Sequence, residues 1–310
     1  MNSSILLAIV IPAYKSKFLD QTLKSISNQT DKRFHLYIGD DNSPEHLYEI
    51  VSKYENKIAI RYKHFEKNLG GIDLVAQWER CIDLVQDEEY IWFFSDDDIM
   101  EETCVADFYR EFERKPYKAI YHFNTKIINS LNKEICPKTY NKQFFQNHMT
   151  QKDYIMGRLY FNINSFAVEY IFNKSEFLRN GRFVKFDLAW GTDDATWIRL
   201  AKQDGIYTIN GSHVLWRISD VNISPTKNHD IIIRKLNASL SYLLYLKNNT
   251  EIIDLKNAAY NYWLHTIYSS CKFISCKEAK ELNDKFFISF NVNPIKRFIL
   301  YYINIFFHLI

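Results

Sequence analysis

The stretch EEYIWFFSDDDIMEE, residues 88–102, places three consecutive carboxylates, Asp96, Asp97 and Asp98, directly after a run of apolar and aromatic residues. The run YIWFF is typical of a buried strand, and the aspartates begin where that strand would end. Two carboxylates about 5 Å apart repel each other by roughly 3 kcal/mol at an effective dielectric constant near 20. A bound divalent cation would offset this repulsion. The alternative is a solvated turn that caps the next helix, where aspartate is common.

The first 125 residues alternate between short apolar runs and amphipathic segments. Their spacing predicts strands at residues 5–11, 34–40, 58–65 and 90–95, and helices at residues 18–28, 45–55 and 72–85. Such alternation predicts an α/β fold, with a mostly parallel sheet flanked by helices. Polar loops follow three of the strands, at PAYK (12–15), DDNSPE (40–45) and SDDD (95–98). Because ligands bind beyond the carboxyl ends of parallel strands, these loops are expected to converge on one site.

The rest of the chain is expected to be less regular at first and then helical. The pattern predicts an antiparallel excursion over 126–170 with a short helix near 151–158, a helix over 191–205 with Thr192 as its N-cap, and strands at 206–210 and 213–219. From about residue 229 the apolar spacing is helical throughout. We therefore expect two parts, residues 1–228 and a helical C-terminal extension at residues 229–310.

Composition is that of an ordinary globular protein, with 310 residues, 47% apolar and 25% charged. The odd number and wide spacing of the cysteines argue against a disulfide framework or a zinc site and favour a reducing, cytoplasmic setting; these are Cys81, Cys104, Cys136, Cys271 and Cys276. The N-terminal run ILLAIVI is expected to be a buried strand and not a signal peptide. No stretch reaches the roughly 20 apolar residues of a membrane-spanning helix.

The order of the motifs resembles that of the family 2 glycosyltransferases of the GT-A fold, bacterial enzymes that transfer a sugar from a nucleotide-sugar. The resemblance covers about residues 5–228 and rests on VIPAYK (10–15), DDNSPE (40–45), NLGG (68–71), YIWFFSDDD (90–98), WGTDDATWIRLAK (190–202) and WRISDVNIS (216–224). It implies an inverting, metal-dependent transfer, most often from a UDP-sugar, to a glycan or a lipid-linked glycan in bacterial surface polysaccharide synthesis.

The resemblance implies a metal site in the acidic loop, holding Mn²⁺ or Mg²⁺ against the pyrophosphate of the donor. Asp96 would lie near the ribose, Asp97 would bind the metal directly, and Asp98 would be a second ligand or would support the first. The sequence departs from the commonest family pattern, which has aspartate where Ser95 stands. That departure affects the expected ribose contact and leaves the metal site intact.

The other loops would bind the nucleotide. By resemblance, Asp41 accepts a hydrogen bond from the base, although an Asx-turn leading to Pro44 would also explain an aspartate there. The turn NLGG would lie against the base and ribose, or would serve only as a turn into the next helix. The donor residues implied outside the acidic loop are Pro12, Ala13, Tyr14, Asp41, Asn68 and Gly70.

A second acidic pair, Asp193 and Asp194, opens the expected helix at 191–205. Acids in the first turn of a helix stabilise it through the helix dipole, and this role alone would explain the pair. By resemblance, Asp194 is the general base that takes the proton from the acceptor hydroxyl. Trp190, Gly191 and Asp193 would then contact the acceptor, with Trp190 either stacked on the acceptor sugar or packed in the core.

Two other functions fit parts of the sequence. A nucleotidyltransferase also uses acidic metal ligands on such a sheet, but PAYKSK lacks the glycines of its phosphate loop. A catalytically inactive nucleotide-sugar-binding scaffold is the second alternative, and the intact Asp97 and Asp194 argue against it. Nucleic-acid binding is not expected, because residues 1–225 carry a net charge of −3 and contain no basic stripe.

The segment NPIKRFILYYINIFFHLI (293–310) is apolar after a basic pair. About thirteen apolar residues of helix are too short to span a bilayer. Residues 294–310 are therefore expected either to contact the inner face of the cytoplasmic membrane peripherally or to pack on the protein itself or in a homodimer. The roles of His229 (metal ligand or surface histidine) and Arg217 (pyrophosphate contact or surface ion pair) stay open at this stage.

Overall fold

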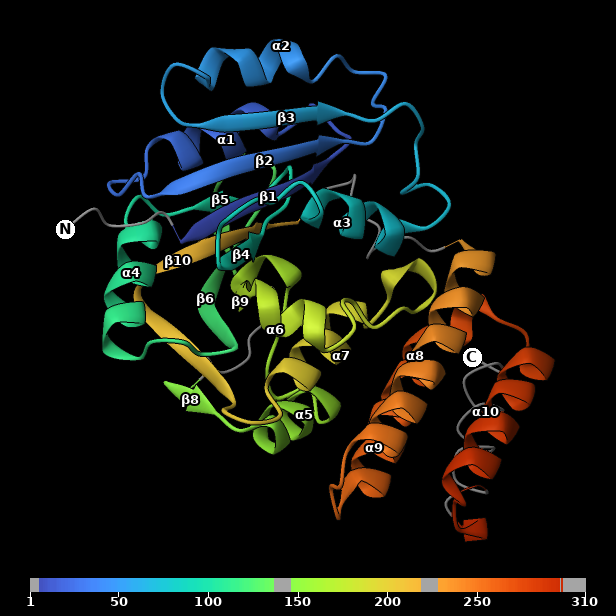
Figure 1. Cartoon of the computed structure of the whole chain (residues 1–310). Coiled ribbons are helices and arrows are strands. Elements are labelled where there is room, and N and C mark those ends of the chain that lie inside the picture. The colour runs from blue at the N-terminus through green and yellow to red at the C-terminus, as the bar shows by residue number, and fades with distance from the viewer. Residues whose placement is uncertain (1–5, 137–145, 219–227, 296, 298–310) are drawn as a thin grey trace.

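The computed structural model describes residues 6–136, 146–218, 228–295 and 297, and within these ranges the chain forms a ten-stranded sheet with helices packed around it (Figure 1). The sheet order is β3-β2-β1-β4-β9-β6-β10-β5, with β7 paired to β6 and β8 paired to β10. The strands are β1 (Leu7–Ala13), β2 (Phe34–Asp40), β3 (Ile60–His64), β4 (Tyr90–Phe93), β5 (Ile99–Met100), β6 (Ile120–Ile128), β7 (Glu134–Ile135), β8 (His148–Met149), β9 (Tyr170–Asn173) and β10 (Ile206–Arg217).

The four strands expected from the first part of the sequence form the parallel half of the sheet. β1 lies in the middle and pairs in parallel with β2 on one side and β4 on the other, while β3 pairs in parallel with β2. β9 joins β4 to the other half by antiparallel pairing with both β4 and β6, and β10 then runs parallel to β6. The predicted α/β architecture with a mostly parallel sheet is thus confirmed, and the carboxyl ends of β1, β2 and β4 lie at one edge.

Alternation along β1 places its side chains in two hydrophobic cores, one on each face of the sheet. Leu7, Ile9 and Ile11 belong to one core, and Ala8 and Val10 belong to the other. The covering helices are α1 (Leu19–Ser27), α2 (Tyr48–Val51), α3 (Leu74–Ile82), α4 (Cys104–Arg114), α5 (Gln151–Leu159), α6 (Lys174–Arg179) and α7 (Thr192–Leu200).

The expected helical C-terminal region is also present. It consists of α8 (His229–Asn249), α9 (Leu255–Ser270) and α10 (Cys276–Phe290), which stand beside the sheet (Figure 1). One hydrophobic core runs through both parts, because Trp197 of α7, Leu243 of α8 and Trp263 of α9 belong to the same buried cluster. Within the described ranges, no helix has both the length and the apolar composition needed to cross a membrane.

Several local predictions were wrong or incomplete. Thr192 is not the N-cap of α7: Gly191 occupies that position with φ of 84°, so the left-handed backbone starts the helix and Thr192 is its first residue. The two strands expected between 206 and 219 are one strand, β10, whose pairing with β6 is interrupted between Ile209 and Val214. The short strand β5 and the helix α4 had no counterpart in the sequence interpretation. All five cysteines lie in described parts of the chain, and none of them is paired with another.

Candidate active site

The acidic loop follows β4 and is joined to the loop that follows β1. The Asp96 carboxylate accepts hydrogen bonds through Oδ2 from the backbone N–H groups of Tyr14 (2.9 Å) and Lys15 (3.0 Å). Burial, and then the neighbouring charge of Asp97, raise the pKa of Asp96 to about 6. Two of the polar loops predicted to converge therefore do so, through the first aspartate of the triplet.

Asp98 is anchored inside the fold. Its Oδ1 accepts from the backbone N–H of Arg217 (2.7 Å) and its Oδ2 from the hydroxyl of Ser95 (2.6 Å). Ser95 also donates to Oδ1 of Asp97 (3.0 Å), so the residue that departs from the family pattern holds both carboxylates. Burial, and then the charge of Asp97, raise the pKa of Asp98 well above its ordinary value.

Arg217 holds the same loop from the opposite side and is fully buried. Its Nε donates to the carbonyl oxygen of Asp97 (2.7 Å), and its Nη1 donates to Oδ1 of Asn132 (2.6 Å). The guanidinium also lies over the ring of Phe18, 4.3 Å from the centroid. The expectation of a surface ion pair is therefore wrong, because Arg217 is part of the support of the acidic loop.

Asp97 lines a small cavity beyond the end of β4, with a volume of about 190 Å³. Aromatic side chains form much of its wall: Trp216 stacks on Phe166 with centroids 4.0 Å apart, and Trp78 meets Phe93 edge to face. The full lining is Pro12, Trp78, Phe93, Phe94, Ser95, Asp97, Asp98, Ala167, Val168 and Trp216. The cavity thus joins carboxylates with apolar rings, a combination suited to a polar ligand with a flat face.

The donor set of this loop fits a hard divalent cation of the Mg²⁺ or Mn²⁺ type. The half-buried Asp96 and Asp97 and the buried Asp98, all with raised pKa values, carry an unfavourable negative charge that such a cation would neutralise. The described residues contain no cluster of three His, Cys, Asp or Glu side chains placed to hold a metal. Mg²⁺ is commonly held by only one or two carboxylates together with substrate phosphates and water. Asp97 is the better placed ligand, since both oxygens of Asp98 already accept hydrogen bonds.

The loop after β2 is braced against the turn at residues 68–71. Oδ1 of Asp41 accepts from the N–H of Leu69 (2.7 Å) and Oδ2 from that of Gly70 (2.8 Å), while Arg80 pairs with the same carboxylate. A Cβ at Gly70 would lie 2.7 Å from Oδ2 of Asp41, so the turn needs glycine there. Asn68 closes the turn by accepting from the N–H of Gly71 (2.8 Å).

An Asx-type bond does exist in the loop after β2, but Asp40 makes it. Its Oδ1 accepts from the N–H of Ser43 (2.8 Å). Asp41, the predicted base contact, is buried and held by the turn. Tyr14, by contrast, is 40% exposed beside this loop, and its carbonyl oxygen accepts from the hydroxyl of Ser43 (2.6 Å).

Asp194, at the start of α7, is held by two residues of α5. Arg158 donates to Oδ2 of Asp194 through Nε (2.9 Å) and Nη2 (2.7 Å), and the hydroxyl of Tyr154 donates to Oδ1 (2.6 Å). Ser165 in turn lies 2.9 Å from the Tyr154 hydroxyl, and only two residues further on Ala167 lines the cavity beside Asp97. Residues 165–168 thus connect the two acidic clusters.

Asp193 is in a different environment, although it is adjacent in the chain. It is half-buried, and no side chain of the described residues donates a hydrogen bond to its carboxylate. Burial, and then the charge of Asp194, raise the pKa of Asp193 to about 7. The pair therefore contains one carboxylate fixed by Arg158 and one that titrates near neutral pH.

Helix α8 covers the residues that precede the acid pair. The indole N–H of Trp190 donates to the hydroxyl of Ser239 (3.2 Å), and Nζ of Lys235 lies 4.6 Å from the centroid of the Trp190 ring. A Cβ at Gly191 would lie 3.4 Å from the ring of Tyr242. The C-terminal region therefore forms one wall of the predicted acceptor side. His229 does not point to the acidic loop: it pairs with Glu278 of α10 (3.0 Å).

The sequence did not reveal the roles of several residues in this arrangement. Ser95 and Trp216 lie inside the motifs YIWFFSDDD and WRISDVNIS, so their positions were a usable signal. Arg158 and Tyr154 lie 36 and 40 residues from Asp194 in a segment without a motif, and no local pattern points to them.

The family model described as "Glycosyl transferase family 2" matches residues 8–171, more than half of the chain. The chain belongs to this family. The matched range contains the acidic loop, the loops after β1 and β2, and α5, whereas α7 and the C-terminal helices lie beyond it. The family of this glycosyltransferase is thus identified from the part of the chain that contains the acidic loop.

Curated relatives agree with this assignment. The processive diacylglycerol beta-glycosyltransferase of Mycoplasma pneumoniae is 24% identical over 266 residues, 80% of this chain and 74% of that protein. Shorter matches are the chondroitin synthase of Pasteurella multocida (44% over 64 residues) and the poly(ribitol-phosphate) beta-N-acetylglucosaminyltransferase TarS of Staphylococcus aureus (29% over 104 residues). These cover 20% and 32% of this glycosyltransferase but only 7% and 18% of the relatives themselves.

Solved structures show the same fold at low sequence identity. Residues 1–349 of S. aureus TarS in complex with UDP-GlcNAc align with a TM-score of 0.58 and 14% identity, covering 92% of this chain and 89% of that chain. The mannosyltransferase PcManGT from Pyrobaculum calidifontis, in complex with GDP-Man and Mn²⁺, aligns with a TM-score of 0.54 and 11% identity, covering 97% and 85%. The predicted GT-A architecture is thereby confirmed for the glycosyltransferase.

Proposed function

We propose that this glycosyltransferase transfers a sugar from a nucleotide-sugar, with UDP as the preferred nucleotide, to a hydroxyl group of a glycan or lipid-linked glycan, with inversion at the anomeric carbon. The observation that carries the proposal is the position of Asp97: its carboxylate faces an aromatic-walled cavity at the sheet edge where the β1 and β4 loops meet. The S. aureus and P. calidifontis structures with UDP-GlcNAc and with GDP-Man support a nucleotide-sugar as the donor class.

The donor would bind along the loops after β1, β2 and β3. The braced turn at 68–71 and the exposed ring of Tyr14 offer a rigid edge and an aromatic face to the base and ribose. Asp96 already accepts two backbone N–H groups, which fixes the loop that would approach the ribose. The proposed donor contacts are Pro12, Ala13, Tyr14, Asp41, Asn68, Gly70 and Asp96.

Asp97 would bind Mn²⁺ or Mg²⁺ directly, with Asp98 as a second ligand or support. When bound, the cation neutralises the pyrophosphate charge that develops as the nucleotide leaves. The chain's own contribution is to hold Asp97 in place through Ser95 and Arg217. The P. calidifontis structure was obtained with Mn²⁺, which supports this choice of metal.

Asp194 is proposed as the general base, and Trp190, Gly191 and Asp193 as acceptor contacts. As the acceptor oxygen bonds to the anomeric carbon, the bond to the nucleotide breaks and the acceptor's hydroxyl proton passes to the carboxylate. Arg158 and Tyr154 orient Asp194 for this step. Because no side chain in the described part of the chain donates to Asp193, we compare Asp193 with Asp194 in the test below.

The acceptor is proposed to be presented at a membrane surface on the cytoplasmic side. The Mycoplasma relative is named for diacylglycerol, a lipid, and TarS for poly(ribitol-phosphate), a polymer, which supports a lipid or polymer acceptor. Residues 294–310 would contribute a peripheral contact or a homodimer contact, and their greater part, 298–310, lies outside the described residues. Residues 1–228 would carry the catalytic domain and residues 229–310 the associating region.

The experiment is to measure transfer and donor binding for Asp97→Ala, Asp194→Asn and Asp193→Asn, with Asp87→Ala as an exposed control. Asp97→Ala should abolish metal-dependent donor binding. Asp194→Asn should leave donor binding intact and lower transfer by about 10²–10⁴-fold.

Metal-independent activity in excess chelator would refute the metal site, and loss of transfer in Asp193→Asn alone would move the base to Asp193. Nucleotide incorporation without sugar transfer would favour a nucleotidyltransferase, and donor binding without any turnover would favour an inactive scaffold.

A further inference from the structure

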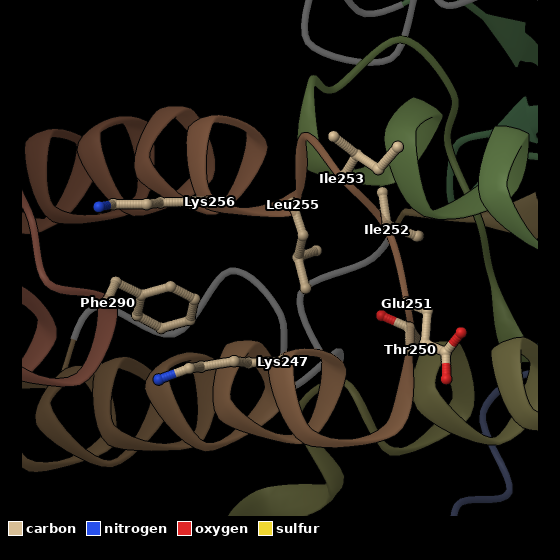
Figure 2. A pocket seen from close by; sticks show the side chains of 8 residues that line it. All are labelled: Lys247, Thr250, Glu251, Ile252, Ile253, Leu255, Lys256 and Phe290. Atoms are coloured by element: carbon tan, nitrogen blue, oxygen red, sulfur yellow. The ribbon is translucent and has the colours of Figure 1, made fainter.

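One end of the helical region, where α8 ends, α9 begins and α10 ends, carries a cavity outside the site described above. Its volume is about 310 Å³. Figure 2 shows Lys247 and Lys256 on facing helices with Phe290 between them, and Ile252 and Ile253 at the other end of the groove. The complete lining is Lys247, Thr250, Glu251, Ile252, Ile253, Leu255, Lys256 and Phe290. We refer to this end of the helical region as the bundle tip.

Large aliphatic side chains project from the bundle tip into solvent. Ile253 is 96% exposed, Ile288 of α10 is 77% exposed and Ile295 is 71% exposed. A single exposed isoleucine is unremarkable. Ile253 lines the groove, and Ile288 and Ile295 lie two residues before and five residues after Phe290, which also lines it, so exposed aliphatic side chains from two segments occur at this end of the helical region. The α8–α9 connection does not need Ile253 for packing, because Ile252 and Leu255 supply the inward contacts.

The bundle tip combines these isoleucines with basic groups. Lys247 donates through Nζ to the carbonyl oxygen of Ser289 (2.6 Å) and Lys256 to that of Asn291 (2.5 Å), so both ammonium groups are fixed beside the end of α10. Each ammonium has three protons, and one of them is used in each of these bonds. Over residues 229–297, ten Lys and Arg face six Asp and Glu, of which Glu251 lines the groove itself.

We propose that the bundle tip is a docking surface for an anionic phospholipid bilayer. The isoleucines would enter the interfacial layer, while Lys247 and Lys256 meet the headgroup phosphates above it. Basic groups that flank protruding aliphatic side chains match the charged headgroup layer and the apolar layer beneath it. A protein partner would be expected to meet a flatter, aromatic-rich patch. The contact uses none of the residues proposed for donor or acceptor chemistry; it rests on the proposed presentation of the acceptor at a membrane surface and assigns the membrane contact to α8, α9 and α10.

The test is flotation of the full chain with vesicles of equal parts phosphatidylglycerol and phosphatidylcholine, compared with phosphatidylcholine alone. The wild type should float with the anionic vesicles, more strongly at low salt. Ile253→Asp/Ile288→Asp should bind about tenfold more weakly or not at all. Leu131→Asp is the matched control, because Leu131 is 73% exposed on the turn between β6 and β7 and lies away from the bundle tip.

A second pair of variants tests the charges. Lys247→Gln/Lys256→Gln should bind the anionic vesicles about tenfold more weakly, whereas Lys277→Gln/Lys280→Gln, at the other end of α10, should bind as the wild type does. Melting temperatures and donor hydrolysis, measured for every variant, identify any loss that comes from unfolding.

Two outcomes would overturn the proposal: a wild type that does not float with either kind of vesicle, and an isoleucine variant that floats as well as the wild type. If the wild type does not float, stabilisation by inorganic phosphate alone would indicate an anion site, and dimerisation through Ile253 and Ile288 in size-exclusion chromatography would indicate a contact between two copies of the chain. Failure of the proposed transfer reaction would leave flotation unchanged, so the two proposals can be separated.

Discussion

At the residue scale, the pair Arg158–Asp194 shows how one carboxylate of two adjacent ones acquires a fixed geometry. Two guanidinium nitrogens and the Tyr154 hydroxyl surround Asp194, while Asp193 receives no side-chain donor among the described residues. A planar guanidinium can hold a carboxylate in one orientation, which an ammonium group does less well. The orientation of Asp194 therefore depends on α5, and substitutions at position 158 should reveal it.

Arg158→Lys keeps the positive charge but loses the bidentate contact. We expect transfer to fall by about tenfold or more while donor binding is unchanged, because the carboxylate keeps its charge partner but not its orientation. Arg158→Met leaves a buried carboxylate unpaired and should lower the free energy of unfolding by about 3–5 kcal/mol. Arg179→Lys, at the exposed pair with Glu176, is the control and should change neither quantity. Equal transfer rates for Arg158→Lys and wild type would contradict the positioning role.

Asp193 makes a second prediction, which concerns stability and pH. Its pKa rises from 3.8 in the unfolded chain to about 7 in the fold. The folded state therefore holds the proton more tightly, and the stability that this group contributes is complete below about pH 4 and is lost as the pH rises through about 7. Asp193→Asn removes this loss, so it should exceed the wild type in stability by about 1–2 kcal/mol at pH 8 and match it near pH 4. Thermal unfolding from pH 4 to pH 8 measures the difference; a gap that does not change with pH would contradict the assignment.

At the element scale, α7 begins in a way that the sequence suggested only in part. The acids of the first turn and the helix that follows could be predicted from residues 191–205, because first-turn acids and apolar spacing are local signals. The N-cap could not, since Thr192 is the more common capping residue and the left-handed backbone of Gly191 has no signature besides glycine itself. Likewise, two strands were predicted between residues 206 and 219, but the backbone continues as the single strand β10. Gly211 lies where the pairing of β10 with β6 is interrupted.

Gly191→Ala tests this helix start against a matched glycine. Gly191 and Gly181 both have positive φ, 84° and 87°, so alanine should cost about 1 kcal/mol of stability at either position. The new Cβ at Gly191 would meet the ring of Tyr242 at an ordinary contact distance of 3.4 Å, so the difference between the two sites is that the strained backbone at Gly191 starts the helix that carries Asp193 and Asp194. We expect Gly191→Ala to reduce transfer severalfold beyond Gly181→Ala, as measured at equal folded fraction. Identical transfer in the two variants would show that the position of α7 tolerates this contact.

At the scale of the whole molecule, the convergence of the polar loops could be predicted from the sequence, and the surroundings of the second acidic pair could not. Each of these loops follows its own strand, and parallel pairing of β1, β2 and β4 brings the loops to one edge. The surroundings of the acidic pair depend on contacts between distant segments, such as Trp190 with Ser239, 49 positions apart. The periodicity of the sequence does not indicate which face of α8 packs against α7. The boundary at residue 228 was drawn from a change in pattern, whereas the hydrophobic core continues across it.

This shared core predicts that residues 1–228 do not form an independent domain. Truncation after Asn228 would expose the rest of the buried cluster to which Leu243 and Trp263 belong, including Trp197, and would remove the hydrogen bond from the Trp190 indole N–H to the Ser239 hydroxyl. Burying one large apolar side chain contributes about 1.5–3 kcal/mol, so the loss of several exceeds the stability of an ordinary domain. We expect this truncated chain to aggregate or to lose its cooperative thermal transition, as measured by circular dichroism and size-exclusion chromatography.

Truncation after Val292 is the matched control: it keeps α8, α9 and α10 and should melt within a few degrees of the full chain. A soluble, cooperatively folded chain of residues 1–228 that still binds donor would refute the prediction and restore the two-domain division inferred from the sequence.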